Sequence, residues 1–293
     1  MKKLIFKGAA TALITPMNND GTVNYVKIKE LTENQILNGI NALVVNGTTG
    51  ESATLTDIEM QTNVRSVVAQ SKGRVPVIAG AGSNSTEHAL LLATQAKEAG
   101  ADCLLLVTPY YNKTSQSGLI KHYLYIADRV ELPIIVYNVP SRTGLNIKPE
   151  TYKALAEHPN IVAAKEANGD LSALAKSLYL CGDSLTFYSG NDDQTIPFLS
   201  MGAMGVISVS SNLLPSVMSK ICHYYFAGEV IAARKLMLEH IGLINSLFCD
   251  VNPIPIKTAM NMCGFAAGPV RPPLYGLKDS DISLLESEIK RIL

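Results

Sequence analysis

Eight short, almost continuous apolar runs recur along the first three quarters of the chain, and they limit the possible folds more than any other feature. The runs are rich in Val and Ile and do not alternate polar with apolar residues, which is typical of strands covered on both faces of a parallel sheet. They span residues 8–16, 40–47, 75–82, 101–109, 132–140, 161–167, 185–191 and 202–209.

Amphipathic stretches between these runs predict helices, and Thr56 and Glu59 have the spacing of a capping box. Eight strand-then-helix units predict a closed (β/α)8 TIM barrel, an α/β fold. The competing architecture is a doubly wound open sheet. It usually has fewer strands and a Gly-rich turn after the first strand, where this chain has Thr15-Pro16-Met17. The predicted helices include 24–38, 57–71, 85–99, 115–130 and 170–181.

From about Phe226 onward the pattern contains helices only, over residues 228–247, 254–263 and 279–292. We therefore predict a catalytic barrel domain over residues 1–225 and a small C-terminal helical domain over 226–293. Because no low-complexity or Pro/Ser-rich linker separates the two, we expect the appendage to pack firmly on the barrel.

The charge balance favours a small-molecule partner, since 25 Lys and Arg residues match 25 Asp and Glu residues without a basic block. The charge pattern does not predict binding to nucleic acid or to a membrane surface. The five cysteines lie far apart without the spacing of a metal site, which fits reduced thiols in a cytoplasmic protein. Lys7 interrupts the N-terminal apolar run, so we expect neither a signal peptide nor a membrane span.

Polar residues collect where the predicted strands end, and in a barrel of this kind the carboxyl ends of all strands meet on one rim. Reactive groups normally stand on that rim. The polar segments are Gly47–Ser52, Tyr110–Lys113, Tyr137–Asn138, Ser141–Gly144, Lys165–Glu166 and Ser189–Asp192.

Lys165 is the strongest of these candidates. It interrupts a strand that should be covered on both faces, where burying a charged ammonium costs free energy. A buried lysine held partly neutral is a nucleophile towards ketones and aldehydes, and the iminium that it forms withdraws electrons from the neighbouring carbon. The alternative is a structural ion pair between Lys165 and Glu166 or another carboxylate.

Other rim residues have both a functional and a structural interpretation. The turn with Thr48 and Thr49 offers amides and hydroxyls to a carboxylate or phosphate, but it also fits a simple capped turn. Tyr137 and Tyr111 could relay protons or merely pack. Arg142 offers a planar fork to a carboxylate, or is a solvated loop charge.

Many barrels bind a phosphate at the loops after the last two strands. Here those loops contain Asn191, Asp192 and Asp193, and the adjacent aspartates argue against an anion. We therefore favour substrates that are carboxylated and unphosphorylated.

Taken together, the motifs resemble those of the pyruvate-dependent class I aldolases and lyases grouped with dihydrodipicolinate synthase and N-acetylneuraminate lyase. The resemblance covers the whole chain, and the order and spacing of its pieces make it specific. The pieces are TALITP, ALVVNGTTGESATL, TPYYNK, YNVPSRTG, KEANGD, GVISV and NPIPIK.

The resemblance implies a role for each matching residue. Lys165 is expected to form a Schiff base with pyruvate, whose carboxylate Thr48 and Thr49 would hold. Tyr137 would carry the proton, linked through Thr49 to Tyr111, which in this family reaches into the neighbouring subunit's site. The two remaining matches, which would line the pyruvate pocket through backbone contacts, are Gly190 and Ile207.

Arg142 discriminates between the branches of the family, because sialic acid lyases generally carry an apolar residue there. The expected reaction is thus condensation of pyruvate with L-aspartate 4-semialdehyde to 4-hydroxy-tetrahydrodipicolinate, on the route to diaminopimelate and lysine. One alternative is a sialic acid or 2-keto-3-deoxy sugar acid lyase that uses the same imine. Another is a catalytically dead barrel that binds an oxo acid.

The resemblance also bears on regulation and assembly. Lysine-inhibited members bind lysine at a dimer interface, and the matching positions here include Ser52, Ala53, Asn84 and Tyr110. Three further positions carry Asp57, Met60 and His88 where sensitive enzymes tend to have His, His and Glu, so we expect weak or absent inhibition. We also expect a homo-oligomer, a tetramer built as a dimer of dimers. No motif indicates a metal, flavin, nicotinamide or pyridoxal phosphate, so no cofactor is expected.

Overall fold

The strands form one closed barrel. In the computed structural model, which describes residues 2–292, eight parallel strands pair in sequence order and β8 pairs with β1. The open-sheet alternative is therefore wrong, and each predicted apolar run contains one strand. The strands are β1 Gly8–Ala12, β2 Ala42–Val45, β3 Val77–Gly80, β4 Cys103–Val107, β5 Ile134–Asn138, β6 Ile161–Glu166, β7 Thr186–Ser189 and β8 Gly205–Ser208.

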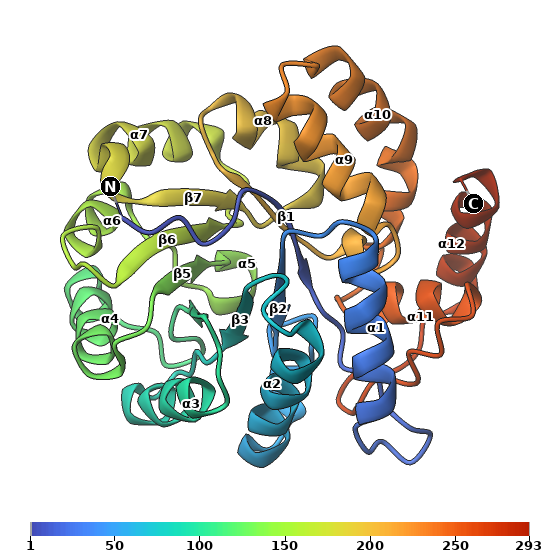
Figure 1. The fold of residues 1–293 in the computed structure, drawn as a ribbon, viewed down its shortest axis with the longest axis horizontal. Helices are drawn as coiled ribbons and strands as arrows, with labels where there is room; N and C mark the ends of the chain where they lie inside the picture. The colour runs from blue at the N-terminus through green and yellow to red at the C-terminus, as the bar shows by residue number, and fades with distance from the viewer. Residues whose placement is uncertain (1, 293) are drawn as a thin grey trace.

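Helices surround the barrel and continue into the C-terminal part of the chain (Figure 1). The predicted helices are confirmed to within about two residues at each end. Short helices that the sequence analysis did not specify follow β5 and β7. The helices are α1 Tyr25–Leu37, α2 Asp57–Ser71, α3 Thr86–Glu98, α4 Gln116–Val130, α5 Pro140–Thr143, α6 Pro149–Leu155, α7 Leu171–Cys181, α8 Thr195–Ser200, α9 Pro215–Phe226, α10 Val230–Ser246, α11 Ile254–Met262 and α12 Asp279–Ile292.

Both faces of the strands are buried, which explains why the apolar runs are continuous. On β2, Val44 packs in the interior of the barrel, whereas Leu43 packs in the layer between the strands and the helices. Successive side chains of a strand point to opposite faces, so each strand supplies both layers.

The N-terminal segment closes the barrel at the end where the strands begin. The Phe6 ring stacks on Tyr188 of β7 with centroids 4.1 Å apart, and the Tyr188 hydroxyl donates a hydrogen bond to the Phe6 carbonyl at 2.7 Å. Lys2 Nζ donates to the carbonyls of His158 and Ile161, both at 2.7 Å. Among the residues that the structure describes, these contacts cover the barrel at the amino-terminal ends of its strands.

The pairing of β5 with β6 contains one irregularity. Ile134 pairs with Ile161, but the next residue, Ile135, pairs with Ala163, so Val162 is an extra residue on β6. This is the pattern of a β-bulge. Beyond it the register is regular, and Tyr137 pairs with Lys165.

The C-terminal helices α10, α11 and α12 follow the barrel and lie along one side of it (Figure 1). Their apolar side chains share a core with the barrel, in which Leu247 and Ile256 pack with Ile14 and Val209. The division into two domains at residue 226 stays a prediction. None of the helices between residues 2 and 292 combines the length and the apolar composition needed to span a bilayer.

A buried ion pair joins the appendage to the barrel. Lys257 Nζ on α11 donates to Glu51 Oε1 at 2.7 Å and to the Thr15 carbonyl at 3.0 Å. The other oxygen of Glu51 accepts from the Arg271 amide at 2.8 Å. Burial lowers the pKa of Lys257, an effect that the Glu51 charge opposes. Since neither charge reaches solvent, each depends on the other.

We predict that Lys257→Met destabilises the protein strongly, because it leaves the Glu51 carboxylate buried without its cation. Breaking a buried pair by removing one partner typically costs about 3–5 kcal/mol. Urea denaturation at a fixed protein concentration measures the free energy of unfolding. Lys278→Met is the matched control, since Lys278 is exposed and lies 3.6 Å from Asp281, so it should change little. Equal stability of the two variants would contradict the importance of the buried pair.

Candidate active site

The alternation of side chains along β6 separates Lys165 from Glu166. Ala163 packs in the barrel interior and Ala164 in the outer layer. Lys165 consequently points inward, and Glu166 points towards the surrounding helices. Adjacent residues on one strand cannot pair across the sheet, so the predicted alternative of a Lys165–Glu166 ion pair is wrong.

Lys165 is buried among aromatic rings. Lys165 is only 5% exposed to solvent, and its Nζ lies 4.3 Å from the centroid of the Tyr137 ring. Tyr137 on β5 and Tyr188 on β7 are its neighbours in the sheet. Among the side chains between residues 2 and 292, no carboxylate forms an ion pair with Lys165. The site therefore contains a buried amine without a counter-charge.

Glu166 has its own partners on the outer face of β6. Its carboxylate accepts hydrogen bonds from the Tyr152 hydroxyl at 2.6 Å, from Asn138 Nδ2 at 2.9 Å and from the Asn168 amide at 2.9 Å. Burial raises the pKa of Glu166 to about 6, while these donors act in the opposite direction. Glu166 thus fixes the strand ends around the lysine without contacting it.

The amine faces a pocket of about 170 Å³ at the end of the barrel where the strands terminate. Most of the predicted substrate-binding residues line this pocket. Ile207 is not among the lining residues, and its fully buried side chain packs in the barrel interior. The predicted residues in the lining are Lys165, Thr48, Thr49, Tyr137, Arg142 and Gly190.

Gly190 provides space for the lysine. A Cβ atom at this position would lie 3.1 Å from Lys165 Cε and 2.7 Å from Ala167 Cβ. The Gly190 amide donates to the Glu166 carbonyl at 2.7 Å, which fixes the β7 end beside β6. Any larger residue at 190 would therefore have to shift Ala167 and would crowd the Lys165 side chain.

The turn after β2 is not simply a helix cap. The cap of α2 is supplied by Thr56, whose hydroxyl accepts from the Glu59 amide at 3.2 Å, while Glu59 accepts from the Thr56 amide at 2.9 Å. The predicted capping box is thus confirmed. Thr48 and Thr49 are consequently free of that task. The Thr49 hydroxyl is buried, and it accepts from Asn252 Nδ2 at 3.0 Å.

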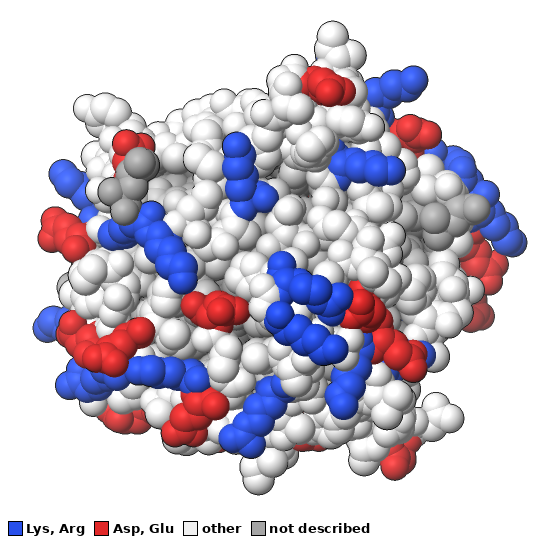
Figure 2. Space-filling model, in the orientation of Figure 1, with Lys and Arg blue, Asp and Glu red and all other residues white. Residues whose placement is uncertain are grey.

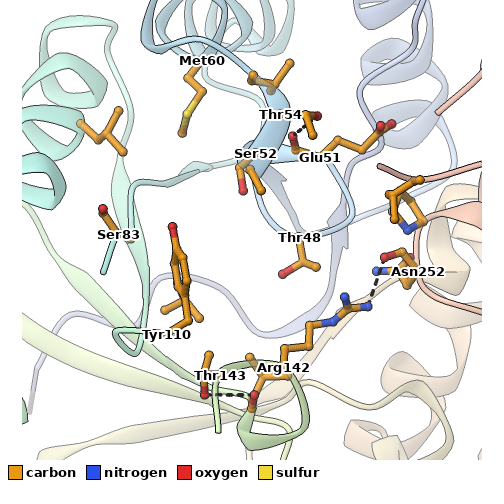
Figure 3. Close-up of a pocket in the computed structure, with 18 of the residues that line it drawn as sticks. Thr48, Glu51, Ser52, Thr54, Met60, Ser83, Tyr110, Arg142, Thr143 and Asn252 are labelled. Atoms are coloured by element: carbon orange, nitrogen blue, oxygen red, sulfur yellow. Dashed lines mark hydrogen bonds between the residues drawn. The ribbon is translucent and has the colours of Figure 1, made fainter. Parts of the chain in front are cut away.

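Arg142 lies on the short helix α5 and reaches across the mouth of the barrel. Its Nη2 donates to the Asn252 carbonyl at 3.1 Å. Figure 3 shows its guanidinium directed towards Thr48 and Asn252. Arg142 lines both the lysine pocket and a second, neighbouring pocket. Its guanidinium therefore lies at the boundary between the two pockets.

Tyr111 lies away from the lysine of its own chain. Its residue is 91% exposed, and its backbone adopts a positive φ of 68°. It lines neither the lysine pocket nor the second pocket. A single chain therefore does not bring Tyr111 to Lys165, and its part in the site stays a prediction.

The second pocket has a volume of about 400 Å³ and contains most of the predicted effector residues (Figure 3). Asn84 is absent from its lining, and its carbonyl accepts from Asn112 Nδ2 at 3.0 Å. Within the pocket, His88 Nε2 lies 3.1 Å from Asp57 Oδ1. The effector candidates and substituted positions in the lining are Ser52, Ala53, Tyr110, Asp57, Met60 and His88.

Backbone amides in the loop after β8 form hydrogen bonds with a carboxylate from the loop after β7. Asp192 is buried, and its Oδ2 accepts from the Val209 amide at 3.0 Å and the Ser210 amide at 3.1 Å. Burial raises the pKa of Asp192. Backbone amides that could bind a phosphate thus bind a carboxylate instead.

On the face drawn in Figure 2, basic and acidic side chains are interspersed.

Sequence reasoning missed one residue of the site, Asn252. It lies between α10 and α11, is 7% exposed, and lines both pockets. The sequence analysis treated Asn252-Pro253 only as part of the NPIPIK motif. A polar residue before a proline at the start of a helix gave no indication that the appendage contacts Thr49 and Arg142.

Comparison with known proteins shows which proteins this chain is similar to. A curated relative named 4-hydroxy-tetrahydrodipicolinate synthase, from Clostridium perfringens (strain 13 / Type A), is 50% identical over 286 residues, which is 98% of each chain. The crystal structure of dihydrodipicolinate synthase from Thermotoga maritima has a TM-score of 0.95 and 42% identity, and the match covers 98% of each chain.

A further solved structure is the chloride-inhibited dihydrodipicolinate synthase from Acinetobacter baumannii, complexed with pyruvate. It has a TM-score of 0.96 and 40% identity, and the match covers 99% of this chain and 100% of that one. The model of the dihydrodipicolinate synthetase family matches residues 5–292. The chain therefore belongs to the dihydrodipicolinate synthetase family.

Proposed function

We propose that Lys165 attacks the carbonyl carbon of pyruvate and forms the imine on which the chain's reaction depends. The chain is a lyase with the activity for which its curated relatives are named, 4-hydroxy-tetrahydrodipicolinate synthesis. The names of these relatives favour this activity over a sugar acid lyase or an inactive binding protein. In the reaction, the imine of pyruvate condenses with L-aspartate 4-semialdehyde, and the adduct cyclises.

One observation supports this assignment above the others: an amine buried in a pocket without a carboxylate partner. The free amine of a lysine is the nucleophile that attacks a carbonyl carbon. Loss of water from the first adduct gives the iminium, which accepts electrons when the pyruvate methyl group loses a proton. Because the iminium is itself the electron sink, this step needs no cofactor.

The neighbouring residues would divide the remaining tasks. Thr48 and Thr49 would hold the pyruvate carboxylate through hydroxyl and amide donors. Tyr137, against whose ring the amine packs, would carry protons to and from the imine. The high exposure of Tyr111 suits a side chain that completes the site of a neighbouring subunit. Gly190 and Ile207 would contribute through their backbones.

Assembly follows from the proposed role of Tyr111. If Tyr111 of one chain completes the site of another, the smallest active unit is a dimer. We propose a homotetramer built from two such dimers. Pyruvate as the first substrate is supported by the related Acinetobacter baumannii structure, which is complexed with pyruvate.

We expect sodium borohydride to trap the imine when pyruvate is present. Mass spectrometry of the intact protein should show a mass gain of one reduced pyruvate, and Lys165→Ala should abolish that gain. Lys113→Ala, which removes another lysine of the rim, is the matched control and should still form the adduct. Absence of an adduct in the wild-type protein would refute the mechanism.

Arg142→Ala should impair use of the semialdehyde far more than imine formation, because Arg142 lies at the pocket boundary and not beside the amine. A hydrogen bond to a charged group contributes about 1.5–3 kcal/mol, which predicts a rise on the order of 10- to 100-fold in KM for the semialdehyde. Steady-state kinetics and borohydride trapping measure the two effects separately. Equal loss of both would show that Arg142 has a different role.

Lysine should inhibit weakly or not at all. His88 lines the second pocket at the position where lysine-sensitive enzymes tend to have Glu, a carboxylate that would bind the lysine ammonium. The His88 ring lies against Asp57 instead. Initial rates titrated with lysine test this prediction. His88→Glu restores a carboxylate and should increase sensitivity, whereas potent inhibition of the wild-type protein would contradict the argument.

A further inference from the structure

A hydrogen-bonded network lies on the outer face of β5 and β6, behind the lysine pocket, and Glu166 is at its centre. Glu166 Oε2 accepts from the Tyr152 hydroxyl at 2.6 Å, and Oε1 accepts from the Asn168 amide at 2.9 Å. Asn138 Nδ2 lies within hydrogen-bond distance of both oxygens, at 2.9 and 3.1 Å. Because Glu166 is only 2% exposed, these protein donors take the place of water around its carboxylate.

The network joins the two strand ends that carry the proposed catalytic side chains. Asn138 directly follows Tyr137 on β5. Glu166 directly follows Lys165 on β6, and both the inward and the outward residues pair in register. Adjacent residues of a strand share one backbone, so a shift of Glu166 relative to Asn138 changes the spacing of the inward pair. That spacing is 4.3 Å from Lys165 Nζ to the centroid of the Tyr137 ring.

The side-chain amide of Asn138 also closes the loop that carries Arg142. Its Nδ2 donates to Asn146 Oδ1 at 2.6 Å, and its Oδ1 accepts from the Ile147 amide at 3.0 Å. Because the Ile147 N–H group can only donate, the amide oxygen must face it, and Nδ2 must face Glu166. The residues between Asn138 and Asn146, which include α5, therefore leave β5 and return to the same side chain.

We propose that the ionised Glu166 carboxylate is a positioning residue, which acts through Asn138 on two separate parts of the active site. These parts are the Lys165–Tyr137 pair and the loop with Arg142. The inference rests on the proposed function of Lys165. All four contacts of the carboxylate are made by donors, which an ionised group can accept on both oxygens. A protonated oxygen carries an O–H group that must itself donate, so protonation disturbs the network.

The surroundings of Glu166 contain no cation that would maintain its charge. None of the ion pairs between residues 2 and 292 includes it. The titratable group that faces it is Tyr152 on α6, with Tyr123 on α4 nearby, and burial raises the pKa of both phenols, so both stay neutral. The Lys176–Glu150 pair of α7 and α6 is exposed to solvent. Hydrogen bonds alone therefore stabilise the ionised form.

The pH dependence of Glu166→Gln tests the proposal. Burial raises the pKa of Glu166 to about 6, so the carboxylate is ionised at pH 8 and largely protonated at pH 5. The glutamine is uncharged at every pH, and its NH₂ group places a donor against the donors of the network. We expect a kcat at pH 8 that is lower on the order of 10- to 100-fold, as for small displacements of reacting groups. The ratio of wild-type to variant kcat should shrink as the pH falls from 8 to 5.

Tyr152→Phe is a second variant, which keeps the charge and removes one donor. The Tyr152 hydrogen bond lowers the pKa of Glu166, so its loss raises that pKa. The decline of kcat with falling pH should therefore begin at a higher pH than in the wild-type protein. An unshifted decline would contradict the proposal, and this result does not depend on whether Glu166→Gln folds well.

Met218→Ala is the matched control for a loss of packing alone. Met218 on α9 is fully buried in the same outer layer and lines neither pocket. Its truncation should lower stability in urea but leave kcat and its pH dependence as in wild type. Wild-type kcat in Glu166→Gln, or a ratio that does not change with pH, would overturn the proposal.

Borohydride trapping with pyruvate distinguishes failure of this inference from failure of the proposed function. If the wild-type protein yields no adduct, the Schiff base itself is refuted, and the role of Glu166 falls with it. If the wild-type protein yields the adduct while Glu166→Gln keeps wild-type kcat, only the role of Glu166 is refuted.

Discussion

The burial of one amine without a counter-charge is the constraint on which the rest of this structure depends. Removing an ammonium from water costs several kcal/mol unless a partner compensates. Here the nearest carboxylate in sequence, Glu166, is directed to the other face of β6 and is bound by Tyr152 and Asn138. The stability of the barrel as a whole maintains this unfavourable arrangement. In the proposed mechanism this same amine attacks the carbonyl carbon of pyruvate, so the cost of its burial and the chemistry belong to one residue.

The appendage takes part in the site and is not only an addition to the barrel. It supplies the buried cation Lys257, which holds the segment after Thr49, and it supplies Asn252, which contacts Thr49 directly. The opposite end of the barrel is closed by Phe6 and Tyr188. The lysine pocket lies at the other end, and its lining comes from both the first and the last parts of the chain, from Ala12 to Asn252.

The fold and the central residue were predictable because each depends on local sequence. Continuous apolar runs specify strands buried on both faces, and a lysine inside such a run is conspicuous. The Thr56–Glu59 capping box could likewise be identified from spacing alone. Asn252 could not be identified in this way, since its role depends on contact with Thr49, which lies about 200 residues earlier. The exposure of Tyr111 also has no local signal, because it depends on how the chain folds around it.

The extra residue on β6 has a consequence for how the site could be lost. Without the bulge at Val162, strict alternation from Ile161 would direct Glu166 into the barrel and Lys165 towards the helices. A carboxylate would then occupy the place of the nucleophile. Deleting Val162 itself would remove the extra residue together with the bulge and would leave Lys165 directed inward. Deleting Ala164, which lies between the bulge and Lys165, would instead exchange the two side chains as long as the bulge persists. Such a chain keeps its eight strands and loses the proposed nucleophile.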